Sequence, residues 1–116
     1  MWGFMSNFKK FVHSHSTQIP TVSGFAKAGR FSFNRPAVTK YGLADFKHCD
    51  LYFDEKTRQI GFVFLLEPSN GSVKVKNYNN NLSVAGSSMC AHFGIDLEKI
   101  KRVEITKSGE MLIIST

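Results

Sequence analysis

The first 44 residues carry charge of only one sign. They contain six Lys and Arg residues and no Asp or Glu, whereas the rest of the chain has nine basic and nine acidic residues, so the whole net charge of +6 lies in this segment. A basic segment attracts polyanions, and nucleic acid is the commonest polyanion that a small protein meets. We therefore expect a surface that binds phosphates; the alternative is a solvated basic face that only maintains solubility.

Six side chains are the candidates for contact with nucleic acid. Arginine can donate two hydrogen bonds to a guanine edge, so Arg30 and Arg35 are candidates for reading bases. Lysine binds phosphates through charge and counterion release, and two lysines at positions 74 and 76 alternate on the outward face of a predicted strand. The expected site comprises Lys27, Arg30, Arg35, Lys40, Lys74 and Lys76. By contrast, Lys101 and Arg102 are predicted to protect a strand edge.

The sequence contains no pattern typical of an enzyme. It lacks the GK[ST] ending of a P-loop, and its acidic residues form no pair suited to acid–base chemistry. Cys90 and His92 are two positions apart on a predicted helix and would face different sides. His13 and His15 have no third ligand at a metal-binding spacing. We therefore predict no catalytic residues, no metal and no cofactor.

Length and cysteine content are those of one small domain. A chain of 116 residues can bury its own core, and Cys49 and Cys90 are expected to be buried free thiols in a reducing cytoplasm. No stretch approaches the ~20 apolar residues of a membrane helix. Residues 1–19 combine apolar residues at helical spacing with Lys9 and Lys10. This segment is expected to be a basic arm or a docking helix, through which a second copy or a protein partner could bind.

Two stretches of the chain match at a nearly constant spacing, which indicates an internal repeat. The residue types match at 51 or 52 positions, and both changes of spacing fall near a helix end or in a turn, where insertions cost little. The matched pairs are Val22 and Val73, Phe31 and Leu82, Phe33 and Val84, Gly42 and Gly94, Leu51 and Val103, Phe53 and Ile105, Ile60 and Met111, and Phe62 and Ile113. We predict one domain, 20–116, of two repeats, 20–66 and 72–116.

Each repeat is predicted to fold as strand, turn, strand, short helix and hairpin. In the first repeat Gly29 suits a tight turn, Asn34 is a helix N-cap, and Gly42 ends the helix in a left-handed conformation. In the second repeat three asparagines, 79–81, form the corresponding turn, and Gly94 ends the helix. The expected strands are 21–26, 31–33, 48–53, 60–66, 72–77, 82–84, 101–105 and 111–115, with helices over about 35–41 and 86–93. The predicted class is mainly β with short helices.

The run Val22–Val38, followed by Tyr41-Gly42-Leu43 and the hairpin Leu51–Phe64, resembles the AbrB/MazE/SpoVT swapped-hairpin domain. That family has a strand, a K-x-G-R turn, an alternating strand, a short helix that ends in leucine-glycine, and a hairpin. The resemblance covers about residues 20–66 well and 72–116 more weakly. It implies a barrel of interleaved hairpins, which two copies in one chain could form alone as a pseudo-dimer, as in MraZ-like proteins.

The resemblance also implies a DNA-binding regulator of transcription. In such domains basic side chains of the turn and helix start contact double-stranded DNA, which would place Lys27 and Arg30 on the turn and Arg35 and Lys40 on the helix. The chain departs from the family because Pro36 follows the strand by three positions and because the second turn lacks the basic pair.

A second resemblance leaves the function open. The chain is also similar to small uncharacterised bacterial and phage-type proteins with an ISFN…LG…LYYD…IG pattern, for which no activity is implied. The alternative function is therefore a non-catalytic interaction module, antitoxin-like or a phage accessory protein, whose N-terminal helix and exposed Phe patch would carry the contact.

Overall fold

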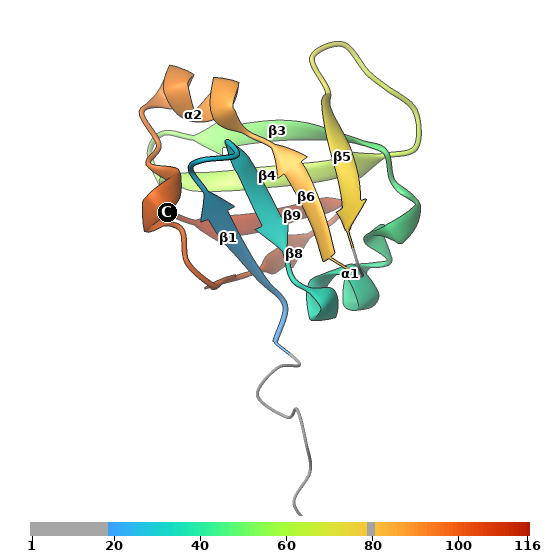
Figure 1. Cartoon of the computed structure of the whole chain (residues 1–116). Coiled ribbons are helices and arrows are strands. Elements are labelled where there is room, and N and C mark those ends of the chain that lie inside the picture. Colours follow the sequence, from blue (N-terminus) through green and yellow to red (C-terminus); the bar gives the residue numbers. More distant parts are fainter. Residues whose placement is uncertain (1–18, 79–80) are drawn as a thin grey trace, which may run out of the picture.

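The computed structural model describes residues 19–78 and 81–116, which form a nearly closed β-barrel with short helices (Figure 1). The strands are β1 (Thr21–Phe25), β2 (Arg30–Phe33), β3 (His48–Asp54), β4 (Gln59–Leu65), β5 (Val73–Tyr78), β6 (Asn81–Ala85), β7 (Val103–Glu104), β8 (Thr106–Ser108) and β9 (Met111–Ser115). The helices are α1 (Arg35–Tyr41) and α2 (Ser87–Phe93), with 3-10 turns η3 (Leu43–Asp45) and η4 (Leu97–Lys99). The predicted class, mainly β with short helices, is confirmed. The predicted N-terminal arm, the pair His13 and His15, and two asparagines of the second turn lie outside the described residues.

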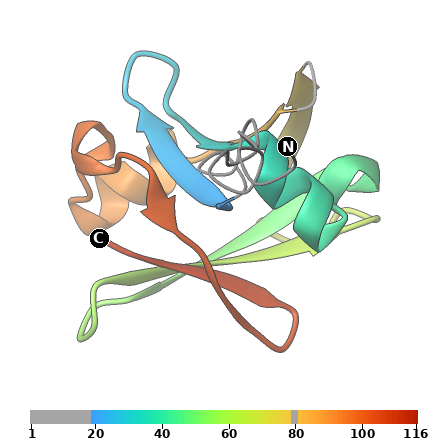
Figure 2. The same ribbon diagram turned by 90° about the horizontal axis from the view of Figure 1, so that it is seen from below.

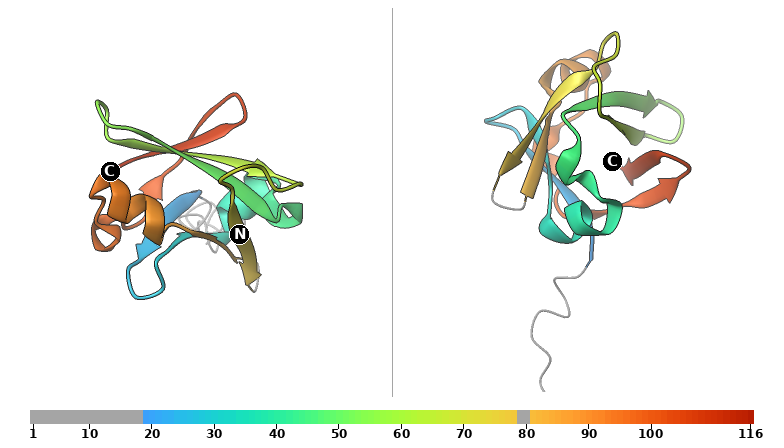
Figure 3. Two further views of the ribbon diagram at one scale, coloured as in Figure 1. Left: turned by 90° about the horizontal axis from the view of Figure 1, so that it is seen from above. Right: turned by 90° about the vertical axis from the view of Figure 1, so that its right-hand side faces the viewer.

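The strands form two layers that cross each other (Figures 2 and 3). The sheet order is β7-β1-β2-β6-β5-β3-β4-β9-β8, and every neighbouring pair is antiparallel. We call β1, β2, β6 and β5 the first layer, and β3, β4, β9 and β8 the second layer. Because β7 leads into β8 after the single residue Ile105, the two ends of this order come together and the barrel nearly closes.

The middle of the first layer is the pairing of β2 with β6. Ser32 lies opposite Ser83, and the flanking pairs, Phe31 with Val84 and Phe33 with Leu82, consist of fully buried residues. Successive side chains of a strand point to opposite faces, so the two serines lie on the outside of the barrel. The alternation of large apolar and small polar residues in both strands therefore separates the core from an outer polar face.

Aromatic side chains fill the interior between the two layers. The ring of Phe62 on β4 meets the rings of Phe31 and Phe33 edge to face, with centroids 5.2 and 5.0 Å apart. Phe33 makes a third such contact with Phe64 at 5.3 Å. Edge-to-face pairs of this kind each add about 0.5–1.5 kcal/mol beyond the burial of their area. The first and second layers are thus joined by one aromatic cluster.

Local signals determine where α1 begins and where both helices end, as predicted, whereas α2 follows Gly86 without a side-chain cap. The side chain of Asn34 accepts a hydrogen bond from the backbone N–H of Ala37 and caps α1. Gly42 and Gly94 follow α1 and α2 with φ of 61° and 66°, the left-handed conformation that glycine adopts without strain. The two helices lie at opposite ends of β2 and β6 (Figure 1).

The structure corrects the predicted match of the last strand. The match paired Met111 and Ile113 with Ile60 and Phe62, which are fully buried, but the buried residues of β9 are Leu112 and Ile114. Residues directly opposite in an antiparallel pair share a face, and Phe62 lies opposite Leu112. The sequence Met-Leu-Ile-Ile is apolar throughout, so its alternation alone could not decide which face points inward.

Candidate nucleic-acid interface

A row of three serines crosses the outer face of the first layer. Ser23 of β1 lies opposite Ser32 of β2, Ser32 lies opposite Ser83 of β6, and Ser83 lies opposite Lys76 of β5. At the other end, the backbone N–H of Arg102 donates to the hydroxyl of Ser23 at 2.9 Å. We call the three serines the hydroxyl row; a basic residue bounds it at each end. Two strand spacings give the row of three serines a width of about 10 Å.

Arg30 lies beside the hydroxyl row and is held in place by it. Its Nε donates to the hydroxyl of Ser83 at 2.8 Å, and its Nη2 donates to the Ser83 carbonyl oxygen at 3.0 Å. A guanidinium has five N–H groups, and these bonds use two of them. Both acceptors are neutral, so the positive charge of Arg30 is oriented across the seam between β2 and β6 without being cancelled by them.

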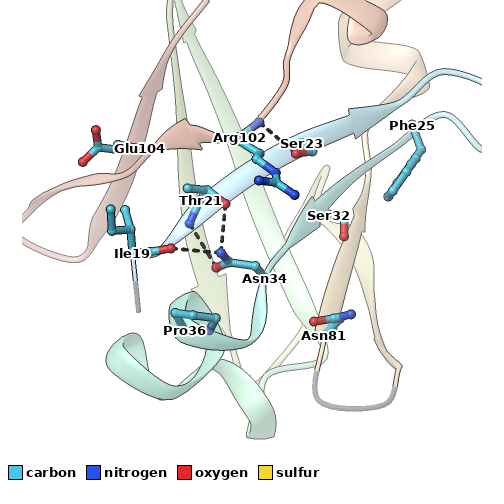
Figure 4. Close-up of a pocket in the computed structure, with 10 residues that line it drawn as sticks. All are labelled: Ile19, Thr21, Ser23, Phe25, Ser32, Asn34, Pro36, Asn81, Arg102 and Glu104. Atoms are coloured by element: carbon cyan, nitrogen blue, oxygen red, sulfur yellow. Dashed lines mark hydrogen bonds between the residues drawn. The ribbon is translucent and has the colours of Figure 1, made fainter. Parts of the chain in front are cut away.

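One end of the face is organised by Asn34. Its Nδ2 donates to the carbonyl oxygen of Ile19 and to the hydroxyl of Thr21, both at 2.9 Å, and its Oδ1 accepts from the backbone N–H of Thr21 at 3.0 Å (Figure 4). These bonds join the start of β1 to the start of α1. Beside them lies a hollow of about 570 Å³, lined by Ile19, Thr21, Ser23, Phe25, Ser32, Asn34, Pro36, Asn81, Arg102 and Glu104.

A second hollow adjoins the first along β1. It measures about 690 Å³ and is lined by Ser23, Gly24, Phe25, Ala26, Lys27, Glu98, Lys101 and Arg102. Phe25 and Arg102 line both hollows, and Phe25 is 57% exposed. Arg102, which sequence analysis assigned to the protection of a strand edge, therefore belongs to the same surface as Lys27. It also has a φ of 47°, a left-handed conformation uncommon for residues other than glycine.

Acidic residues are absent from the sequence segments that build the first layer and the two α-helices. Residues 19–44 and 72–95 contain no Asp or Glu, and they carry all six of the predicted nucleic-acid-binding residues. The acidic residues belong to η3, the second layer and its loops, and the η4–β7 segment: Asp45, Asp50, Asp54, Glu55, Glu67, Asp96, Glu98, Glu104 and Glu110. The β2–β6 pairing thus places two acid-free segments, far apart in sequence, side by side.

The structure separates the six predicted residues into three groups. Lys27 lies in the β1–β2 turn, whereas Arg35 and Lys40 lie on α1 at the opposite end of β2 (Figure 1). The turn and the helix start were expected to form one basic surface, but they do not converge on one point. Arg30 is the first residue of β2 and belongs with Lys27 at the turn end. Lys74 and Lys76 are exposed on β5 at the other side of the same layer.

The residues that connect these groups were not predicted from the sequence. The hydroxyl row, Phe25 and Arg102 were not among the predicted site residues. One signal could have found two of the serines: each lies between two large apolar residues in Phe-Ser-Phe and Leu-Ser-Val, a pattern that exposes the serine on a strand. The position of Arg102 depends on the long-range pairing of β7 with β1, for which the sequence carries no local signal.

The two cysteines are buried free thiols, as predicted. Burial, helped by the nearby Asp50 carboxylate, raises the pKa of the Cys49 thiol to about 12, and burial also raises the pKa of Cys90. Among the described residues no three His, Cys, Asp or Glu side chains are grouped closely enough to hold a metal ion. None of the helices in the described part of the chain has the length and apolar sequence needed to cross a bilayer.

Comparison of the chain with models of protein families, with curated proteins and with solved structures gave no match.

Proposed function

We propose that this protein binds nucleic acid through the outer face of its first layer. The observation that carries the proposal is the segregation of charge: both acid-free segments meet at the β2–β6 seam, and the acidic residues belong to other parts of the barrel. A surface that is basic over several strands lowers the electrostatic energy of a nearby polyanion, and clustered Lys and Arg are the usual footprint of nucleic-acid binding.

The polar residues of the face suit the same ligand. Serine, threonine and asparagine side chains donate hydrogen bonds to phosphate oxygens and fix the register of a bound strand. The hydroxyl row supplies such donors between Arg102 and Lys76, and Arg30 is already oriented by Ser83. Long-range attraction by the lysines and short-range positioning by the row together describe a phosphate-binding surface.

The arrangement of strands supports the inference that the barrel is a pseudo-dimer of two β-β-α-β-β repeats with swapped hairpins. The β1–β2 hairpin pairs with β7, and the β5–β6 hairpin pairs with β3, so each N-terminal hairpin is bonded to the other half of the chain. Ser32 and Ser83, which are equivalent at a spacing of 51, lie opposite each other at the centre. A fold of this kind is consistent with the expected role in transcription, with double-stranded DNA as the first ligand to test.

The test compares two double variants that remove the same charge from different faces. Lys74→Gln/Lys76→Gln alters the first layer, whereas the control, Lys56→Gln/Lys107→Gln, alters exposed lysines of the β3–β4 turn and of β8. Binding of a fluorescein-labelled oligonucleotide of mixed sequence, unpaired and as a duplex, is measured by anisotropy at ~50 and ~200 mM salt, the range over which phosphate contacts weaken binding strongly.

We expect the first-layer variant to bind about tenfold more weakly, because it loses phosphate contacts. Each lost contact should also lower the steepness of the dependence of log K on log salt by ~0.7–0.9. The affinity of the control variant for the oligonucleotide should stay within about twofold of the wild-type affinity at equal salt. Equal losses in both variants would reduce the effect to net charge alone. The absence of salt-sensitive binding in the wild type would contradict the proposal and favour the interaction-module alternative.

A further inference from the structure

Phe25 is an aromatic residue that lies outside the core. It is the last residue of β1, its side chain points to the outer face, and 57% of it is exposed, whereas the core phenylalanines 31, 33 and 62 are fully buried. Lying opposite Arg30 in the β1–β2 register, it belongs to the same face as the hydroxyl row. An exposed aromatic ring between basic groups is a typical element of surfaces that bind unpaired bases.

The two hollows that Phe25 lines differ in chemistry. The larger one has three basic side chains, Lys27, Lys101 and Arg102, against one carboxylate, Glu98. Five of the ten residues that line the smaller one carry a hydroxyl or amide group, and Arg102 and Glu104 also line it (Figure 4). Basic groups suit phosphates, and hydroxyl and amide groups suit the edges of bases. Both volumes fall in the range of about 300–1,000 Å³ that small ligands occupy.

Arg102 connects the two hollows, and its backbone is fixed by a hydrogen bond to β1. It lines both of them, and its backbone N–H is bonded to the hydroxyl of Ser23 at 2.9 Å. Its φ of 47° is a conformation that costs energy outside glycine and that clusters at ligand-binding sites. A guanidinium beside an exposed aromatic ring can contact a phosphate while a base stacks on the ring.

We propose that the preferred ligand is an unpaired nucleic-acid strand, one base of which stacks on Phe25 while its phosphates lie along Lys27, Lys101 and Arg102. This inference rests on the proposed function and names its ligand. A duplex keeps its bases stacked on each other and offers only edges and phosphates, so it cannot use the exposed ring. The three basic groups of the larger hollow match a phosphate backbone, and the hydroxyl and amide groups of the smaller one match base edges.

The experiment uses the full chain and a 12-nucleotide DNA of mixed sequence, labelled with fluorescein, at ~100 mM salt. Anisotropy gives the affinity for the single strand and for its duplex. The variants are Phe25→Ala, Phe25→Leu and Phe25→Trp, and the control is Tyr52→Ala, which removes a half-exposed aromatic ring from β3 in the second layer. Thermal unfolding of each variant verifies that it is folded.

We expect the single strand to bind more tightly than the duplex. Phe25→Ala and Phe25→Leu should weaken single-strand binding about 5- to 100-fold, because base stacking is lost, and should leave duplex binding within twofold. Tyr52→Ala should change neither. Phe25→Trp, in a Trp2→Phe background that removes the natural tryptophan, should keep the affinity, and its fluorescence should be quenched when a base stacks on it.

The outcomes separate this inference from the proposed function. If the duplex binds as well as the single strand and Phe25→Ala changes neither affinity, the inference is overturned while the proposed function stands. The same holds if Phe25→Ala weakens both ligands equally, because the ring would then not distinguish an unpaired base. If neither ligand binds, both proposals fail, and the exposed side chains of Phe25 and Ile19, which line the same hollow, would form the apolar contact of a protein-interaction module.

Discussion

Arg30 donates two hydrogen bonds to a single residue across the β2–β6 seam, one to the hydroxyl and one to the carbonyl oxygen of Ser83. The two residues are 53 positions apart in the chain, so only the long-range pairing of these strands brings them together. Because the bond uses the fork geometry of the guanidinium, lysine cannot replace it. The positive charge at the turn end of the β2–β6 seam is therefore oriented by the fold itself.

Two substitutions of Arg30 distinguish the effect of its charge on binding from the effect of its hydrogen-bond geometry. Arg30→Lys keeps the charge and loses the fork, so we expect nucleic-acid affinity to fall about 3- to 10-fold with the salt slope unchanged. Arg30→Gln also removes the charge and should lower the slope by ~0.7–0.9. Anisotropy titrations at three salt concentrations measure both quantities. Identical affinity for wild type and Arg30→Lys would show that the orientation of Arg30 by Ser83 has no role in binding.

The side chain of Asn34 joins β1 to α1 through four hydrogen bonds, with Ile19, with Ala37, and twice with Thr21. We expect Asn34→Ala to lower the free energy of unfolding by about 2 kcal/mol, the upper part of the range for a lost N-cap, because it also frees the start of β1. Asn34→Asp keeps both acceptor roles and should recover about half of the loss. Urea unfolding measures both; equal stability of the two variants would contradict the assignment of separate donor and acceptor roles.

Gly86 lies at the start of α2 in contact with the core. A Cβ added there would lie 2.3 Å from a ring carbon of Phe31, which is fully buried and cannot move aside. We expect Gly86→Ala to cost about 3 kcal/mol through overpacking. The control is Gly109→Ala in the β8–β9 turn, where an added Cβ would meet no atom within 4 Å. Only the φ of 61° causes strain there, and this strain costs about 1 kcal/mol. Similar losses in both variants, measured by urea unfolding, would be inconsistent with this packing.

The buried thiol of Cys49 makes the free energy of unfolding depend on pH in the alkaline range. Its thiol ionises near its ordinary pKa of 9.0 in the unfolded chain but, because of burial and Asp50, only at a pKa of about 12 in the folded protein. Ionisation therefore favours unfolding: the stability is fully present below pH 9 and falls as the pH rises toward 12, by up to about 1.4 kcal/mol per pH unit. Urea unfolding at pH 8, 9 and 10 should show a steeper decline for wild type than for Cys49→Ala. Parallel declines would mean that Cys49 is not shielded from solvent.

Sequence reasoning predicted the elements whose signals are local. The N-cap Asn34, the left-handed Gly42 and Gly94, and the alternation in Phe31-Ser32-Phe33 each act within a few residues, and each was found as expected. The match of Met111 and Ile113 with Ile60 and Phe62 was wrong because a continuous apolar run has no alternation to read. What distinguishes these cases is whether the determining contact lies nearby in the chain.

The candidate site was predicted as residues but not as a surface. All six basic side chains lie on the acid-free segments, yet Lys27 and Arg35 lie at opposite ends of β2. The β2–β6 and β1–β7 pairings, which add the hydroxyl row and Arg102, join parts of the chain about 50 and 80 residues apart. Such pairings depend on the packing of the whole core, so no short sequence pattern carries them.

Lysine footprinting tests the central claim most directly. The full chain is acetylated with and without a bound single strand, and the modification of each lysine is followed by mass spectrometry. We predict that Lys74 and Lys76 of β5, together with Lys27 and Lys101 beside Phe25, lose reactivity about fivefold or more, whereas Lys56 and Lys107 keep theirs, because only phosphate-bound amines are shielded. Protection of Lys56 and Lys107 with unchanged reactivity of Lys74, Lys76 and Lys27 would place the ligand on the other layer and contradict the account.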